Sequence, residues 1–161
     1  MKVEQKLLSM GLVLPAPVKP PPGISVPFSW ARVYGDRVYL SGHGPLAADG
    51  SVLGPTGKVG AEVSPEEAYI AARAATLTLL SSLQRAIGDL DRVTAWLMVS
   101  GMINVAPGFV NTTLVMNPCS NLLLELYGEE VGIHARTAIG VAQLPLNFPV
   151  VISAEVAIRT N

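Results

Sequence analysis

The sequence predicts one α+β domain, with elements in the order β-β-α-β-α-β and a sheet backed by two helices. Three observations lead to this prediction. Two alternating segments flank a Gly-Asp turn, two helix starts pair a capping residue with a proline, and the last third of the chain holds two further strand-like segments. At 161 residues the chain has the length of a single domain with its own core.

The first 26 residues predict a short helix and an arm, and residues 27–161 predict the domain proper. Apolar residues recur at helical spacing between residues 3 and 10, and Gly11 ends the segment. Six prolines between residues 15 and 27 predict an extended arm. We favour an arm packed along the domain surface over a ligand for a polyproline-binding partner, because short prolyl runs are common in connectors.

A β-hairpin is predicted where residues 30–34 and 37–41 flank the Gly-Asp pair. The second strand is followed by His43 between two glycines, where a ligand can approach the backbone and an imidazole titrates near neutral pH. His43 is therefore a candidate for moving protons, although lone loop histidines are more often incidental. The glycine-rich residues 47–63 contain no phosphate-binding motif and predict a mobile surface loop.

The first long helix is indicated by its N-terminus. Ser64 is a capping residue, a proline follows, and Glu67 completes a capping box, so we expect a helix to Ile87 that ends at Gly88. Its apolar stripe predicts a role in the core. Residues 91–102 then predict a strand whose two alternating sets are both largely apolar. Such a strand is expected to be covered by a helix on one face and by a neighbouring subunit on the other.

A second helix is predicted for residues 117–127, because Asn117-Pro118 repeats the pattern of cap and proline and Gly128 follows as an end. Cys119 would then lie in the first turn, where the helix dipole lowers the pKa of a thiol. A residue that only fills space is the more common role for such a cysteine.

Arg136 stands apart from other charges, because none of the eighteen residues between it and Glu155 is charged. Alternation over residues 135–143 predicts a strand with a bulky face and a small-residue face, and the arginine stands among the small residues. A buried guanidinium needs a counter-anion, since an unpaired buried ion costs several kcal/mol. A bound carboxylate or phosphate would supply it, and a salt bridge to a distant acid or contact with solvent is the alternative. Residues 150–159 predict the second strand of this closing pair.

Composition restricts the partners that we expect. Hydrophobic residues make up 50% of the chain and charged residues 14%, which predicts burial of some surface against other subunits. No apolar run is typical of a membrane span and the N-terminus is not typical of a signal peptide, so we expect a cytoplasmic protein without a membrane partner. A single cysteine excludes an intramolecular disulfide. With a net charge of -1 and no metal or nucleotide motif, we expect no nucleic-acid partner, metal or cofactor.

Three motifs resemble one known family. Ala-Arg-Thr at residues 135–137, the run GVAQLP at residues 140–145 and the strand VYLSG at residues 38–42 are similar to signatures of the YjgF superfamily, also called reactive-intermediate deaminases (Rid) or endoribonuclease L-PSP proteins. The resemblance covers most of the chain from about residue 27. It implies a chorismate-mutase-like fold and a homotrimeric barrel with a ligand cleft between each pair of subunits.

The resemblance also implies a chemistry. In the best-understood members an arginine binds the carboxylate of a 2-imino or 2-enamino acid, and a water hydrolyses the imine to a 2-keto acid and ammonia. Arg136 matches that arginine. The other matched positions are Gly42 and Ala138, which offer backbone contacts, Phe28, which stands where the deaminases have a tyrosine, and Asn117, which matches an asparagine more loosely.

Two departures from the family pattern bear on activity. Phe28 replaces the tyrosine, and Val151 replaces a glutamate that helps to place the water. His134 stands where a proline is common and could supply the lost acid or base group, with an interface role as the alternative.

The leading prediction from the sequence is a hydrolase (deaminase) of small imines or enamines. Arg136 would anchor the substrate, and His134 or His43 would handle protons. The alternative is a protein of the same fold that binds a small carboxylate without turning it over. Ribonuclease activity is not expected, because no basic patch with interleaved aromatics is present, and chorismate mutase activity would rest on the fold alone.

Overall fold

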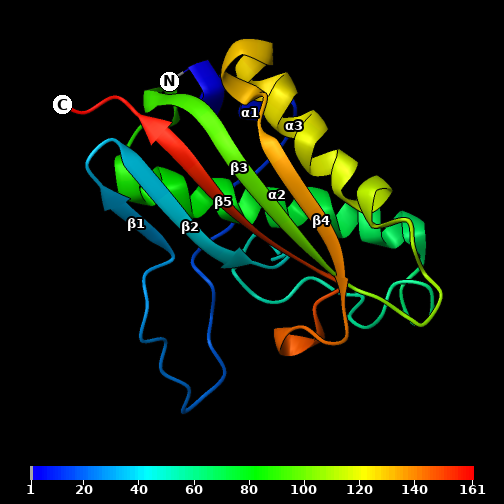
Figure 1. The fold of residues 1–161 in the computed structure, drawn as a ribbon. Helices are drawn as coiled ribbons and strands as arrows, with labels where there is room; N and C mark the ends of the chain where they lie inside the picture. The colour runs from blue at the N-terminus through cyan, green and yellow to red at the C-terminus, as the bar shows by residue number, and fades with distance from the viewer. Residues whose placement is uncertain (1) are drawn as a thin grey trace.

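The computed structural model describes residues 2–161, which form one five-stranded sheet with two long helices on one face (Figure 1). The strand order is β1-β2-β5-β3-β4, in which β3 and β4 are parallel and the other neighbours are antiparallel. The predicted α+β class and the sheet backed by two helices are confirmed. The elements are α1 (Lys2–Ser9), β1 (Ala31–Tyr34), β2 (Arg37–His43), α2 (Pro65–Ile87), η1 (Leu90–Arg92), β3 (Val93–Asn104), α3 (Thr112–Gly132), β4 (Ala135–Val141), η2 (Pro145–Asn147) and β5 (Val150–Ile158).

The last strand, β5, lies in the centre of the sheet. It pairs with β2 on one side and with β3 on the other. The expected closing pair of β4 and β5 is therefore not formed, because β3 separates the two strands. Strands β3 and β4 are joined by α3 in a βαβ unit and lie side by side, and β5 pairs with the other edge of β3.

Helix α2 begins and ends where the sequence predicts. The Ser64 hydroxyl accepts a hydrogen bond of 3.1 Å from the Glu67 backbone N–H, and Gly88 follows the helix with a φ of 83°. Small and branched side chains such as Ala72 and Leu79, which are 0% and 1% exposed, pack it against the sheet. Neither α2 nor any other helix within residues 2–161 has the length and hydropathy needed to cross a membrane.

Helix α3 begins before its predicted start. Its N-cap is Asn111 and Pro118 lies inside it, so the predicted start at Asn117 is wrong. Packing overrides the local signal of cap and proline, because Val115 and Met116 are both 0% exposed and extend the buried side of the helix upstream. The missing N–H of the proline is tolerated in this packed setting.

The predicted surroundings of Cys119 are also wrong. The thiol lies in the helix interior at 1% exposure, not in the first turn. Burial raises the pKa of Cys119 to about 11, against a hydrogen bond with Thr76 and the charge of Arg136, which both lower it. Gly128 does interrupt the helix with a φ of 76°, as predicted, but further helical turns continue to Gly132.

The start of the proline-rich arm lies against α2. The Ser81 hydroxyl of α2 donates a hydrogen bond of 2.6 Å to the Pro15 carbonyl, and Pro15 is buried. The start of the arm is therefore packed against the domain, whereas Pro20, Pro22 and Gly23 farther along the arm are exposed. The glycine-rich segment at residues 47–63 is also anchored, because Val59 and Val63 are both 0% exposed and bridge to each other.

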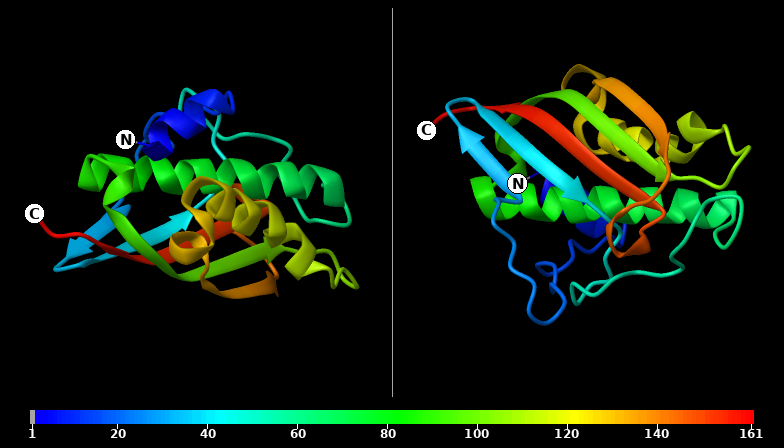
Figure 2. Two further views of the ribbon diagram at one scale, coloured as in Figure 1. Left: turned by 90° about the horizontal axis from the view of Figure 1, so that it is seen from above. Right: turned by 60° about the horizontal axis from the view of Figure 1, so that its bottom comes forward.

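The face of the sheet away from α2 and α3 is open in the single chain (Figure 2). On that face Tyr39 and Ile139 are 47% and 49% exposed, and Met98 and Met102 are half-buried. The expected cover on both faces of β3 is therefore present on the helix side only. A sheet with an uncovered, mostly uncharged face is typical of a chain that packs against other copies.

Candidate functional site

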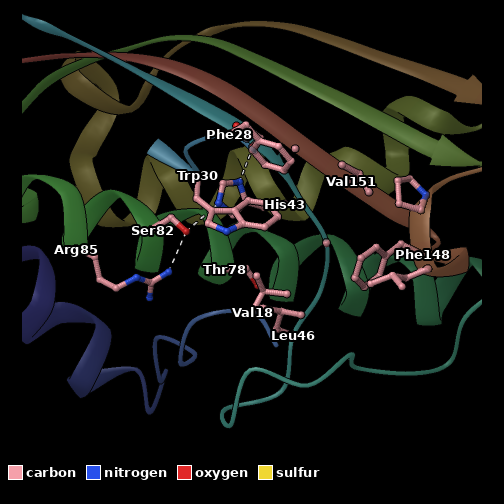
Figure 3. Close-up of a pocket in the computed structure, with 15 residues that line it drawn as sticks. Val18, Phe28, Trp30, His43, Leu46, Thr78, Ser82, Arg85, Phe148 and Val151 are labelled. Atoms are coloured by element: carbon pink, nitrogen blue, oxygen red, sulfur yellow. Dashed lines mark hydrogen bonds between the residues drawn. The ribbon is translucent and has the colours of Figure 1, made fainter. Parts of the chain in front are cut away.

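A cavity of about 530 Å³ opens beside the end of β2, between α2 and the turn at η2 (Figure 3). Its volume is in the range of small-molecule sites. Three residues that the sequence singles out, Phe28, Gly42 and His43, line it, and so does Val151. Much of the remaining wall is apolar and includes Val18, Leu46 and Phe148.

His43 is held in this wall by a chain of hydrogen bonds. It is the last residue of β2 and is 2% exposed, whereas the sequence placed it in a loop. Its Nδ1 lies 2.5 Å from the Ser41 carbonyl, which can only accept, so Nδ1 carries the hydrogen. Its Nε2 lies 2.9 Å from the hydroxyl of Ser82, and the Ser82 oxygen accepts from Arg85 at 3.0 Å. We call Arg85, Ser82 and His43 the pocket chain.

The imidazole of the pocket chain is uncharged at neutral pH. Burial lowers the pKa of His43 to about 4, and the charge of Arg85 acts in the same direction, against the hydrogen bond with Ser41. The ring of Trp30 packs at a centroid distance of 5.3 Å and adds to the apolar surroundings. Nε2 of neutral His43 therefore accepts a hydrogen bond from the Ser82 hydroxyl, and Arg85 carries the only charge among these three residues.

The sequence did not indicate that residues of α2 contribute to the pocket. Thr78, Ser82 and Arg85 follow one another at spacings of four and three, so they lie on one face of the helix. The apolar stripe of this helix predicted a role in the core. The polar residues at helical spacing were a second signal, which becomes informative only when β2 is known to lie beside them.

Two glycines shape the opposite wall. A Cβ at Gly42 would lie 2.8 Å from Val151 Cγ1, and a Cβ at Gly44 would lie 2.5 Å from the ring of Phe148. Both glycines therefore let the strand pass close to apolar side chains of the wall. This is a spatial reason for glycine at these positions, since neither has a positive φ.

Arg136 lies at the other edge of the sheet, on β4, and its guanidinium is directed at α3. It donates to Asn117 Oδ1 at 3.1 Å, to Ser120 Oγ at 3.0 Å and to the Thr113 carbonyl at 3.3 Å. Asn117 is thus close to Arg136, as the family match implies. Among residues 2–161 no acidic side chain forms an ion pair with Arg136, so a salt bridge to a distant acid is not its partner.

His134 joins Arg136 through a shared hydroxyl. His134 Nε2 lies 2.8 Å from Ser120 Oγ, the same atom that accepts from Arg136, and Nδ1 lies 2.7 Å from the Gly132 carbonyl. We call Arg136, Ser120 and His134 the edge chain. Its neighbour Ala138 contributes its backbone carbonyl, which accepts from the Thr112 hydroxyl at 3.0 Å.

Within one copy of the protein, the predicted site residues therefore form two separate groups. Phe28, Gly42 and His43 belong to the pocket, whereas Arg136, Ala138, His134 and Asn117 belong to the β4 edge. The register runs from His43 to Ile152, then Gly101, then Ala138. Three steps of about 4.8 Å separate the ends of this row by roughly 14 Å. The two histidines accordingly do not form a pair.

Three carboxylates lie together elsewhere, at the junction of α1 and η1. Oxygen atoms of Glu4, Asp89 and Asp91 are within 4.8 Å of one another. These oxygens already accept hydrogen bonds from the backbone, for example Asp91 from the Val3 N–H at 2.9 Å and Glu4 from the Leu90 N–H at 2.9 Å. The cluster thus fastens α1 to η1, which explains it without a cation.

Comparisons with known proteins agree with this architecture. A family model described as "YjgF/chorismate_mutase-like, putative endoribonuclease" matches residues 4–156. The chain is 37% identical over 158 residues to Protein TCP17 of Trypanosoma cruzi, an alignment that covers 98% of this chain and 95% of that protein.

Two solved structures have nearly the same fold. One is a protein with unknown function from Agrobacterium tumefaciens, with 33% identity, a TM-score of 0.85 and coverage of 98% of this chain and 94% of that one. The other is described as a "putative endoribonuclease" from Shewanella oneidensis, with 29% identity, a TM-score of 0.86 and coverage of 98% and 100%.

Proposed function

Since the chain belongs to the YjgF/chorismate mutase-like family that its motifs resemble, we propose that it hydrolyses small 2-imino or 2-enamino acids. Arg136 would bind the substrate carboxylate in a cleft formed between copies of the chain. Water adds to the carbon of the C=N bond, that bond breaks, and the products are a 2-keto acid and ammonia. Because such imines hydrolyse readily, binding, orientation and a positioned water are sufficient.

The observation that carries this proposal is the environment of Arg136. Its described hydrogen-bond partners are neutral oxygens, which orient the guanidinium but leave its charge uncompensated. A planar guanidinium fixed in this way favours a carboxylate, which accepts two parallel hydrogen bonds. His134, which shares Ser120 with Arg136, is the nearby group for proton transfer.

A homotrimer would complete the cleft. Strand β4 is an edge strand and leaves one side of its backbone unpaired, and the sheet face beyond it is open. A neighbouring copy could then bring its pocket, with Phe28 and Gly42, to Arg136. Static light scattering would give three times the 16.9 kDa of one chain if this assembly forms. A monomeric mass would exclude both the trimer and the cleft shared between copies.

A second candidate, a protein that binds a small carboxylate without turning it over, is supported by the two departures from the family pattern. Phe28 and Val151 line the pocket with apolar surface where the deaminases have polar groups around the water. Arg136 would bind the same class of ligand in either case.

The deciding experiment is imine hydrolysis. An amino-acid oxidase generates 2-imino acids, and semicarbazide traps whatever the protein has not hydrolysed. We expect the wild type to lower the trapped fraction and Arg136→Ala to reduce that rate by roughly thirtyfold, since charged hydrogen bonds contribute on the order of 2 kcal/mol. Arg73→Ala is the control, because Arg73 is a charged residue of α2 that is not among the residues lining the pocket and is not among the described hydrogen-bond partners of Arg136. If the wild type accelerates hydrolysis for none of several amino acids, the deaminase is excluded and the second candidate, a carboxylate-binding protein, is favoured.

A further inference from the structure

The pocket chain repeats the edge chain bond for bond. In each, an arginine donates to a serine hydroxyl, the serine oxygen lies against the Nε2 of a histidine, and that histidine's Nδ1 bonds to the carbonyl two residues before it. The serines are Ser82 and Ser120. We infer that the pocket is a second carboxylate site, in which Arg85 binds the carboxylate of an organic acid and the cavity holds its apolar body.

Charge is the first argument. Among the described residues that line the pocket, Arg85 alone carries a full charge, because His43 is neutral there. In the part of the chain that the structure describes, no acidic side chain pairs with Arg85. Its hydrogen bonds go to the hydroxyls of Ser81 and Ser82, at 2.6 and 3.0 Å. A carboxylate is the complementary charge for this guanidinium, because its two oxygens can accept paired hydrogen bonds from the planar fork.

Orientation is the second argument. The two serine hydroxyls hold the guanidinium at one end of the cavity, while its remaining N–H groups stay unassigned. Figure 3 shows Arg85 at that end and Phe148 and Val151 at the other, with Ser82 and His43 linked to the arginine by hydrogen bonds. Arg85 is itself exposed, so a ligand can reach it from solvent.

Size gives the class of acid. Thr78 and Arg85 both line the cavity and are seven residues apart on α2, which corresponds to about 10 Å along a helix. The walls beyond Arg85 are formed by side chains such as Leu46, Phe148 and Val151. A monocarboxylate with an aromatic ring or a branched chain on a short linker fits this length and this surface.

This inference goes beyond the proposed function, because it requires neither Arg136 nor a second copy. In a trimer the pocket would form one wall of the shared cleft, and the acid would still bind through its own arginine. The two ideas can therefore fail separately.

Calorimetric titration with 3-phenylpropanoate and with its neutral amide tests the inference. We expect the acid to bind the wild type about tenfold more tightly than the amide, because a hydrogen bond to a charged group contributes about 1.4 kcal/mol more than a neutral one. Arg85→Gln should abolish the difference, and Arg85→Lys should keep part of it, since the point charge remains. The control Arg73→Gln should leave the difference intact.

Three results would overturn the second site. Equal affinity of acid and amide, or binding of neither, would exclude a carboxylate site at Arg85. Loss of the difference in Arg136→Gln but not in Arg85→Gln would assign the carboxylate to the β4 edge, and this outcome would support the proposed function. Thermal unfolding of each variant, followed by circular dichroism, shows that the comparison is made between folded proteins.

Discussion

The pocket chain and the edge chain have the same hydrogen-bond order but different depths. His43 and Ser82 are 2% and 5% exposed and border a cavity, whereas His134 and Ser120 are half-buried at the rim of the sheet. At the inner position, burial by one chain is enough to lower the pKa of the imidazole. The outer position is only partly enclosed, so its surroundings depend on what packs against β4. The same set of hydrogen bonds can thus occur in a site that a single copy of the protein encloses and in a site that neighbouring copies would enclose.

The largest expected effect of depth is on the protonation of His43. The pKa of His43 is lowered to about 4 from an ordinary 6.5. Between these values the unfolded chain binds a proton that the folded chain does not, so stability is full above pH 6.5 and falls as the pH drops toward 4. The loss is about 3 kcal/mol by linkage. Urea unfolding at a series of pH values measures it.

The matched variants for this test are His43→Gln and His134→Gln. We expect the first to remove most of the acid-dependent loss and the second to retain it. An NMR titration of the ring protons gives the pKa of His43 directly. A pKa near 6.5, or the same pH dependence in His43→Gln as in the wild type, would contradict the difference in depth.

The two serines should differ by a smaller amount. Ser82→Ala leaves the buried Nε2 of His43 without a donor, which costs about 1–3 kcal/mol. Ser120→Ala frees groups that water can reach, so we expect a loss of less than about 1 kcal/mol. Midpoints of urea unfolding at pH 7 measure both. Equal losses in the free energy of unfolding would show that burial does not distinguish the pocket chain from the edge chain.

The smallest expected difference is between Gly42 beside the pocket and Gly140 on β4. Gly42→Ala places a Cβ 2.8 Å from Val151, and Gly140→Ala places one 2.9 Å from Val105, so each should cost about 1 kcal/mol by overpacking. Only the first glycine lines the pocket. We therefore expect Gly42→Ala to weaken the binding of 3-phenylpropanoate several-fold, with no change for Gly140→Ala. Unchanged binding by Gly42→Ala would move the acid away from this wall.

Sequence patterns predicted the elements whose signals are local. The cap at Ser64 and the stop at Gly88 lie in the helix that they delimit, and the alternation around Arg136 lies in its own strand. The family motifs also predicted the fold class. The start of α3 was missed because Val115 and Met116 extend the helix through contacts with the sheet, which no neighbouring residue in the sequence reveals.

The candidate site was predicted only in part, for the same reason. Arg136 and His134 are two residues apart, so their association could be expected from the strand. Arg85, in contrast, meets His43 only because β2 lies along α2, a contact between residues separated by 42 positions. The separation of Gly42 from Ala138 depends on the order of strands in the sheet, which local periodicity does not contain.

The central place of β5 has a consequence for synthesis. Strands β2 and β3 do not pair with each other, and each is joined to the sheet through β5. Until residues 150–158 leave the ribosome, the hairpin and the βαβ unit are separate pieces with unpaired edges. The sheet therefore closes only once residues 150–158 are available, and a chain that stops before residue 150 would expose two edges that can aggregate.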